Sequence, residues 1–314
     1  MGMDIREYRE KEKQNIAGRP NLSGGYGPGT YREAFLPASI VSTRIMIYYP
    51  HAYVKGKLPV FINLHGGGFV LAFPEVDDVY CRRIAEEAMC IVVNVDYVLA
   101  PEHKFPAAVH ECYDVALSLW NGAGSLPIDP RKIAIGGHSA GGNLAAAVCL
   151  LAREKTKPKI ALQVMDYPVL DLATPPREKD RSPLPSTDLM ELGELYNAWY
   201  LKSADDARNP LASPLLAPDL TGLPPALIIT AENDVLREEA ESYGIRLRAA
   251  SVPVLRRNYR GCGHGFTHIG PKEAADDAWR LICATLHEAF HGKGVFRDED
   301  SFFGSSSQTL FLMS

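Results

Sequence analysis

The sequence of 314 residues has no run of five or six basic residues, and its formal net charge at pH 7 is -5. Proteins that bind nucleic acid through the phosphate backbone usually carry a basic run or a basic excess. The sequence pI of about 6.0 agrees with this absence. We therefore expect no nucleic-acid partner.

Long apolar segments are also missing. No stretch approaches the roughly 18 consecutive apolar residues that cross a membrane. The first residues, MGMDIREYREKEKQNIAGRP, are charged where a signal peptide would be apolar. We expect a cytoplasmic protein with no membrane span.

Cofactor and metal motifs are scarce. The six cysteines are scattered without a CxxC pair, and four lie within apolar stretches, which favours buried free thiols. No GxGxxG occurs, and the GxxxxG at residues 137–142 is followed by Asn143 and Leu144, where a phosphate-binding loop needs Lys and Ser or Thr. We predict neither a cofactor nor a metal.

What the sequence does contain is an alternation of short strands and longer helices. Runs rich in Val and Ile predict strands at residues 42–49, 59–65, 90–97, 132–137, 160–167, 225–230 and 252–259. Amphipathic stretches predict helices at residues 78–88, 107–122, 141–155, 236–250 and 273–290. This alternation indicates a mostly parallel sheet with helices on both faces, the α/β class.

Three segments break the alternation and divide the chain. Residues 1–40 contain many glycines and little periodicity, and residues 172–215 join a proline-rich loop to one helical segment. A long insertion in a regular alternation usually has a function, such as a lid. Residues 292–314 have a Ser-rich centre and predict a flexible tail, or a tail that docks its Phe and Leu residues. The predicted core is then residues 41–171 and 216–291.

The sequence GGHSAGG places Ser139 between Gly137 and Gly141, after a predicted strand and before a predicted helix. Such a sharp turn strains the serine, and side chains two positions away would collide with neighbouring backbone. The turn would hold Ser139 at the carboxyl end of the sheet, with the amide of Ala140 at the positive end of the helix. Alone, the motif fits a plain glycine-rich turn equally well.

A second glycine-rich motif, HGGGF at residues 65–69, lies at the end of another predicted strand. Because glycines leave the backbone accessible, the amides of Gly66 and Gly67 could form an oxyanion hole with the amide of Ala140. A flexible loop is the simpler interpretation of a glycine triplet. It does not explain why the triplet precedes a strand–serine–helix turn.

A reactive serine needs a base, and the base needs an acid to orient it. Asp234 and His264 each follow a predicted strand, so both lie beyond the carboxyl end of the sheet. The chain order Ser, Asp, His is the one expected after this serine turn. Glu232 and His268 are rivals for the two roles.

Together these motifs resemble the hormone-sensitive-lipase-like family of α/β-hydrolase carboxylesterases. The resemblance covers roughly residues 40–290 and includes HGGGF, DYVLAPEHKFPAAVHE, GHSAGGNLAA, YPVLDL and HGF, in that order. It implies an α/β-hydrolase fold with an eight-stranded, mostly parallel sheet and a small helical cap built from residues 1–40 and 172–215. It also implies cofactor-free hydrolysis of short- to medium-chain acyl esters, acetyl esters included, and a possible homodimer.

The resemblance also assigns roles to single residues. It makes Ser139 the nucleophile, His264 the base, Asp234 the acid, and the amides of Gly66, Gly67 and Ala140 the oxyanion hole. The residues predicted to line the substrate pocket are Phe69, His138, Leu189, Leu192, Tyr196, Trp199 and Tyr200. Those on the helical segment could equally pack the cap on the core.

The sequence departs from the family pattern at three positions. His138 stands where the family has Asp before the serine, Val98 where Arg is usual, and Val235 where Pro is common. None of these changes removes a catalytic group. We expect His138 to alter the electrostatics beside Ser139.

Other functions fit parts of the sequence. An amidase, a deacetylase or a lactonase would use the same machinery. HEAFH at residues 287–291 fits the HExxH zinc-protease signature, but Arg297 stands where the extended form needs a third His, and a polar helix end explains the motif better. A ligand-binding receptor, as among the gibberellin receptors that resemble this family without its catalytic histidine, is opposed by the presence of His264.

Overall fold

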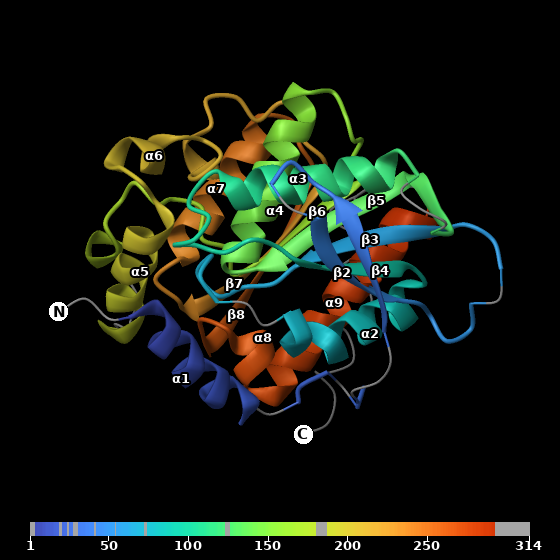
Figure 1. The fold of residues 1–314 in the computed structure, drawn as a ribbon, viewed down its shortest axis with the longest axis horizontal. Coiled ribbons are helices and arrows are strands. Elements are labelled where there is room, and N and C mark those ends of the chain that lie inside the picture. The colour runs from blue at the N-terminus through green and yellow to red at the C-terminus, as the bar shows by residue number, and fades with distance from the viewer. Residues whose placement is uncertain are drawn as a thin grey trace, which may run out of the picture.

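The computed structural model describes residues 4–18, 21–23, 25–27, 31–40, 42–53, 55–71, 74–122, 126–179 and 187–292. Figure 1 shows the fold. Its elements are α1 (Ile5–Ala17), β1 (Arg32–Pro37), β2 (Ser42–Tyr48), β3 (Leu58–Leu64), η1 (Pro74–Asp77), α2 (Asp78–Ala88), β4 (Ile91–Asp96), α3 (Ala107–Trp120), β5 (Ile128–His138), α4 (Ala140–Glu154), β6 (Leu162–Asp166), η2 (Pro176–Glu178), α5 (Thr187–Tyr200), α6 (Ala204–Arg208), η3 (Pro214–Leu216), β7 (Ala226–Asn233), α7 (Arg237–Ala249), β8 (Val254–Gly263), α8 (Phe266–Ile269) and α9 (Lys272–His291).

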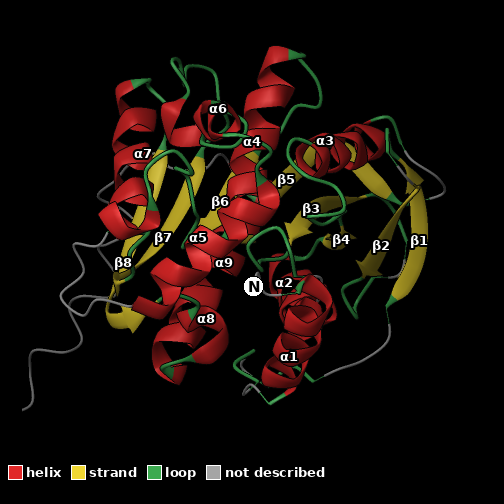
Figure 2. Ribbon diagram, turned by 60° about the vertical axis from the view of Figure 1, so that its left-hand side comes forward, coloured by secondary structure: helices red, strands yellow, loops and turns green. Residues whose placement is uncertain are grey.

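Within the described residues, eight strands form one sheet in the order β1-β2-β4-β3-β5-β6-β7-β8. Figure 2 shows this sheet running from β8 at the left to β1 at the right. Strands β3 to β8 are parallel to one another, and β2 is antiparallel to both of its neighbours. The predicted α/β class with a mostly parallel sheet is confirmed.

Helices cover both faces of the sheet. Figure 1 shows α3, α4 and α7 over one face, while α2 and α9 lie over the other. Strand β3 contributes side chains to the cores on both faces of the sheet. Val60, Ile62 and Leu64 pack beneath α3, α4 and α7, and Phe61 packs beneath α2 and α9. Burial on both faces explains why the parallel strands have almost continuous apolar sequences.

Two elements in residues 1–40 were not predicted, namely α1 and β1. Helix α1 is largely charged, and its Tyr8 is buried. The Tyr8 hydroxyl lies 2.7 Å from the Tyr196 hydroxyl of α5, so the first helix contacts the helix of the 172–215 segment (Figure 1). A polar helix that buries so little gives a weak periodic signal.

The other predicted segments have different outcomes. The described part of residues 172–215 follows β6 and precedes β7, and it contains η2, α5, α6 and the start of η3. The predicted tail lies outside the described residues, apart from Gly292. In the described part of the chain, no helix is long and apolar enough to cross a membrane.

Candidate active site

Ser139 lies in the turn that joins β5 to α4, with backbone angles φ 53° and ψ -116°. A residue other than glycine rarely adopts such angles. Two glycines let the turn pack against β3, because a Cβ atom at Gly137 or Gly141 would overlap the carbonyl oxygen of Leu64. The close approach of three backbone segments therefore explains the Gly-x-Ser-x-Gly pattern.

Asp234 and His264 follow β7 and β8 and meet Ser139 at the carboxyl end of the sheet. The His264 Nε2 atom lies 3.0 Å from Ser139 Oγ, and His264 Nδ1 lies 2.8 Å from Asp234 Oδ2. The other Asp234 oxygen accepts the amide proton of Leu236 at 3.0 Å. A neutral imidazole with its proton on Nδ1 therefore donates to Asp234 and accepts from the Ser139 hydroxyl.

The rival residues have other partners. Glu232 Oε2 accepts the backbone amide proton of Gly261 at 2.7 Å, which directs this carboxylate away from His264. His268 Nδ1 lies 2.7 Å from the Tyr167 hydroxyl, and its Nε2 atom faces Asp77. The structure thus brings Asp234 and His264, and neither rival, into one hydrogen-bond chain with Ser139.

The carboxylate of Asp234 decides the direction in which the pKa of His264 shifts. Burial of the imidazole lowers its pKa, but the facing carboxylate of Asp234, by charge and by hydrogen bond, outweighs burial and raises the pKa above its ordinary value of 6.5. The Asp234 side chain is only 1% exposed, so water screens this attraction poorly. His264 is therefore a stronger base than a histidine in water.

The HGGGF loop gives the Gly66 amide a partner that the sequence did not predict. The Gly66 amide donates to His138 Nε2 at 3.0 Å, so its proton already has an acceptor and does not fit the oxyanion hole. Gly67 and Gly68 have φ angles of 111° and 61°, which side chains rarely allow, and both residues line the cavity above Ser139. Among the described residues, no acceptor is found for either amide proton.

His65 supports this loop from behind. Its Nδ1 atom lies 2.8 Å from the Gly66 carbonyl oxygen, and its own carbonyl oxygen accepts the Tyr97 hydroxyl proton at 2.7 Å. The His65 and Tyr97 rings stack with centroids 4.2 Å apart. These contacts fix the His65 ring and backbone behind the loop, so His65 shapes the loop.

A cavity of about 280 Å³ opens above Ser139 and His264. Among the predicted pocket residues, Phe69, His138, Leu192 and Tyr196 line it. Tyr200 and Trp199 do not.

The remaining predicted residues have other surroundings. Tyr200 is fully buried and stacks on Phe69 at 3.9 Å, and Trp199 packs against Tyr8. The side chain of Leu189 lies outside the described residues. Tyr200 and Trp199 therefore follow the alternative that the helical pattern left open, in which they pack the segment on its neighbours.

The sequence did not reveal several lining residues. Tyr167 follows β6 directly, so the position of a strand end could have indicated it. Lys179 gave no signal, because its partner is distant in sequence: its Nζ atom lies 2.7 Å from Glu239 Oε2, and both side chains are 7% exposed. Burial raises the pKa of Glu239 although Lys179 opposes the shift.

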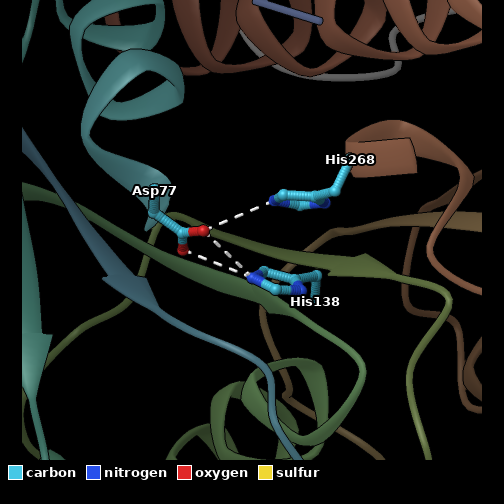
Figure 3. A group of neighbouring side chains, drawn as sticks. All are labelled: Asp77, His138 and His268. Atoms are coloured by element: carbon cyan, nitrogen blue, oxygen red, sulfur yellow. Dashed lines mark hydrogen bonds and ion pairs between the residues drawn. The ribbon is translucent and has the colours of Figure 1, made fainter. Parts of the chain in front are cut away.

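Two further histidines and a carboxylate form a separate group beside the triad. Asp77, His138 and His268 each offer one ligand atom, and these atoms lie within 4.8 Å of one another. Figure 3 shows the three side chains converging from η1, the end of β5 and α8. Of the described residues, this group has the composition and spacing to hold a metal ion.

The HExxH motif lies elsewhere. His287 and His291 are exposed near the end of α9, with ring centroids 4.9 Å apart. Neither residue lines the cavity. The His291 Nε2 atom instead lies 3.2 Å from the carbonyl oxygen of Ala88 at the end of α2. This packing fits a polar helix end and gives no support to a zinc protease.

Comparison with known proteins identifies relatives along most of the chain. A family model described as the alpha/beta hydrolase fold matches residues 61–268. An arylesterase of Saccharolobus solfataricus is 37% identical over 247 residues, which cover 78% of this chain and 79% of the relative. The carboxylesterase NlhH of Mycobacterium tuberculosis (strain CDC 1551 / Oshkosh) is 36% identical over 254 residues, which cover 79% and 78%.

A solved structure agrees with these matches. The esterase of Pyrobaculum calidifontis in its monoclinic form is 36% identical and superimposes with a TM-score of 0.82, covering 91% of this chain and 94% of that one. The fold and the family predicted from the sequence are confirmed. The chain therefore belongs to the α/β-hydrolase family, with esterases as its relatives.

Proposed function

We propose that this chain hydrolyses carboxylic esters through Ser139, His264 and Asp234. The observation that carries this proposal is the continuous hydrogen-bond chain from Asp234 through His264 to Ser139, at 2.8 and 3.0 Å, at the floor of a cavity. Relatives named arylesterase and carboxylesterase match more than two thirds of the chain. The protein is an ester hydrolase, and the roles of single residues are our proposal.

The proposed reaction proceeds by acyl transfer. His264 Nε2 takes the hydroxyl proton as Ser139 Oγ attacks the ester carbonyl carbon, and the same proton then passes to the leaving alcohol. Water, deprotonated by His264, then attacks the acyl carbon; the bond from Ser139 Oγ to that carbon breaks, and the imidazolium returns the proton to Oγ as the acid leaves. Asp234 keeps the proton of the neutral imidazole on Nδ1 and stabilises the imidazolium that forms in each step.

The negative oxygen of the tetrahedral intermediate needs hydrogen-bond donors. We assign this role to the amides of Gly67, Gly68 and Ala140, because the Gly66 amide already donates to His138. The Ala140 amide is at the first turn of α4, where the helix leaves amide protons without intrahelical acceptors. Each such donor is typically worth about 10²- to 10³-fold in turnover.

We further propose that α1 and residues 172–215 form a cap over the cavity. Glu12 of α1 and Leu192, Tyr196 and Asn197 of α5 contribute to its lining. At about 280 Å³ the cavity is slightly smaller than most ligand pockets, which range over roughly 300–1,000 Å³. This size supports short- to medium-chain acyl esters as substrates.

The decisive experiment compares the chain and Ser139→Ala on p-nitrophenyl esters from acetate to palmitate, with EDTA present throughout. We expect turnover to peak at short or medium acyl chains and to fall at least about 10⁴-fold in Ser139→Ala. Circular dichroism melting serves as the fold control.

Two results would contradict the proposal. Near-normal turnover by folded Ser139→Ala would remove the serine from the mechanism. A maximum at palmitate would refute the assignment of acyl-chain length. Parallel assays on an anilide and on a lactone compare the ester with the amidase and lactonase alternatives.

A further inference from the structure

A group of polar side chains outside the triad lies next to the serine turn. Asp77 ends η1, His138 ends β5 directly before Ser139, and His268 lies in α8. Asp77 and His268 are each 4% exposed at the side chain, and His138 is 18% exposed. The group is therefore largely removed from bulk water, where an unpaired carboxylate would be costly.

The spacing of the ligand atoms suits a tetrahedral metal ion. His138 Nε2 lies 3.3 Å from Asp77 Oδ1, and His268 Nε2 lies 3.4 Å from the same oxygen. Ligand atoms bound to zinc at about 2.0–2.1 Å in a tetrahedron lie about 3.3–3.4 Å apart. Figure 3 shows both rings directing a nitrogen atom toward the Asp77 carboxylate.

The hydrogen bonds around His138 indicate a lone pair on its Nε2 atom. This atom accepts the Gly66 amide proton at 3.0 Å, so in a neutral ring Nε2 carries no proton of its own. Yet the same Nε2 atom lies 3.3 Å from both oxygens of Asp77. In that tautomer Nε2 offers no proton to the Asp77 carboxylate, whereas a cation bound between the two groups would be attracted by both.

Partners of the other two ligands fix their orientation. Asn63 Nδ2 donates to Asp77 Oδ2 at 2.8 Å, which leaves Oδ1 for the histidines. His268 Nδ1 lies 2.7 Å from the Tyr167 hydroxyl and 3.0 Å from the Thr267 hydroxyl. Thr267 donates its own proton to Asp166 at 2.7 Å, so its oxygen can accept the Nδ1 proton. Histidines that bind metals usually donate the second ring proton in this way, which leaves Nε2 for the ion.

From this geometry we infer that Asp77, His138 and His268 form a binding site for a divalent transition-metal ion of the zinc class, with its fourth coordination position open to the substrate cavity. All three residues line the same cavity as Ser139. Two imidazoles and one carboxylate are donors that zinc prefers, and zinc sites with three protein ligands keep a fourth position for a small molecule.

A bound ion would inhibit ester hydrolysis for two reasons. Its fourth position would project into the cavity beside Ser139 and exclude part of the substrate. The ion would also take the His138 lone pair from the Gly66 amide, which disturbs the loop that carries Gly67 and Gly68. The hydrolysis proposed above does not pass through the ion, so this inference goes beyond it.

Cobalt(II) is the probe for binding, because tetrahedral Co²⁺ absorbs visible light and substitutes for zinc at N and O ligands. The background variant is His287→Ala, which removes the exposed pair of His287 and His291 on α9 as a competing surface site. The chain is dialysed against EDTA and then against metal-free buffer, and is titrated with Co²⁺. We expect the visible absorption of tetrahedral Co²⁺ to saturate at one ion per chain and to disappear when Zn²⁺ is added.

Ligand variants assign the signal to the group. In Asp77→Asn and in His268→Gln, we expect Co²⁺ affinity to fall at least about 100-fold, since even loss of an outer partner of a ligand typically costs 10- to 100-fold. If Asp77→Asn or His268→Gln fails to fold, His138→Gln takes its place, because the His138 side chain is the most exposed of the three. His51→Gln changes an exposed histidine in the turn that follows β2; it is the matched control and should bind Co²⁺ as the background does.

The optical signal is independent of hydrolysis, so failure of this inference and failure of the proposed reaction are distinguishable. Zn²⁺ should lower the rate of p-nitrophenyl acetate hydrolysis in the background variant, and EDTA should restore it. No tetrahedral band up to millimolar Co²⁺, or equal affinity in all ligand variants, would overturn the site. Tight Co²⁺ binding without any change in hydrolysis would overturn the inhibitory role.

Discussion

Ser139 has a backbone conformation that glycine adopts more readily than any other residue. Residues in such sparsely populated regions cost of order 1–3 kcal/mol each, and they persist where the surrounding structure fixes them. Here the Ser139 amide donates to the Asp166 carbonyl oxygen at 2.9 Å, and the Ser139 carbonyl oxygen accepts from Asn143 at 3.2 Å. These bonds hold the strained residue with its hydroxyl toward His264.

This strain predicts a difference between two inactive variants. Ser139→Gly should have a higher free energy of unfolding than Ser139→Ala by about 1 kcal/mol, because both lose the hydroxyl and only glycine relieves the strained angles. Urea denaturation of the two variants measures the difference. Since glycine loses about 0.4–1 kcal/mol through the entropy of the unfolded chain, lower stability of Ser139→Gly by that amount would show that the turn stores no strain.

The raised pKa of His264 predicts the acidic limb of the pH–rate profile. The reaction needs neutral His264, so kcat/KM should fall as pH decreases through a pKa above 6.5. In Asp234→Asn the carboxylate that raises this pKa is gone, so the limb should move to lower pH while kcat falls by about 10⁴-fold.

Glu232→Gln is the matched control for that profile, since Glu232 lies two positions before Asp234 and bonds to the Gly261 amide instead. Its acidic limb should coincide with that of the unmodified chain. A shift in Glu232→Gln and none in Asp234→Asn would reverse the assignment of the acid.

Single residues differ in how well the sequence predicted them. The positions of Ser139, Asp234 and His264 at strand ends were predictable, because each follows a strand whose apolar sequence fixes its end; their catalytic roles stay a proposal. The Gly66–His138 bond was not, since it joins residues 72 positions apart and depends on how one ring is turned. The group of Asp77, His138 and His268 was not predicted for the same reason, and the sequence analysis predicted no metal.

At the scale of elements, the contacts of α1 tie the N-terminal segment to the cavity wall. Arg9 donates through Nε to the Val70 carbonyl oxygen at 2.8 Å and through Nη2 to the Ala100 carbonyl oxygen at 2.7 Å. It also forms an ion pair with Glu102 at 2.8 Å. Val70 directly follows the HGGGF loop, so Arg9 connects the first helix to the site.

We therefore predict that Arg9→Ala loosens the proposed cap. KM for p-nitrophenyl butyrate should rise several-fold while kcat stays within about two-fold, because substrate contacts weaken and the triad is untouched. Arg6→Ala, an exposed residue one turn away on the same helix, should leave both constants unchanged. An equal loss of kcat in Arg9→Ala would show that α1 supports the triad itself.

Strands were more predictable than the elements of the proposed cap. Each predicted strand is present, because parallel strands buried on both faces need continuous Val and Ile. Helix α1 was not predicted because charged residues fill more than half of its length. Strand β1 was not predicted because four of its six residues are exposed, which leaves no apolar run. The packing of such elements depends on partners far along the chain.

At the scale of the whole molecule, a buried carboxyl couples stability to pH. Burial raises the pKa of Asp166 to about 7, although its hydrogen bond from Thr267 opposes the shift. The folded chain therefore holds this proton at pH values where the unfolded chain has lost it. Ionisation of Asp166 thus lowers stability progressively as pH rises from about 4 to 7.

Asp166→Asn mimics the protonated carboxyl at every pH. We expect it to raise the melting temperature relative to the unmodified chain, and to do so more at pH 8 than at pH 5. Thermal melts at the two pH values measure the two differences. A gain that is larger at pH 5 would contradict the raised pKa.

Two predictions about the whole molecule stay predictions. A homodimer and a cytoplasmic location both came from the sequence or the family resemblance. Light scattering coupled to size-exclusion chromatography measures the first.

The burial of all six cysteine thiols has a practical consequence. Maleimide dyes react with accessible thiols, so the folded chain should be nearly inert to them. A cysteine introduced at the exposed position Ala198 of α5 would then carry a single fluorophore beside the cavity. Such a label would report the arrival of an ester as a change in emission, before any bond is broken.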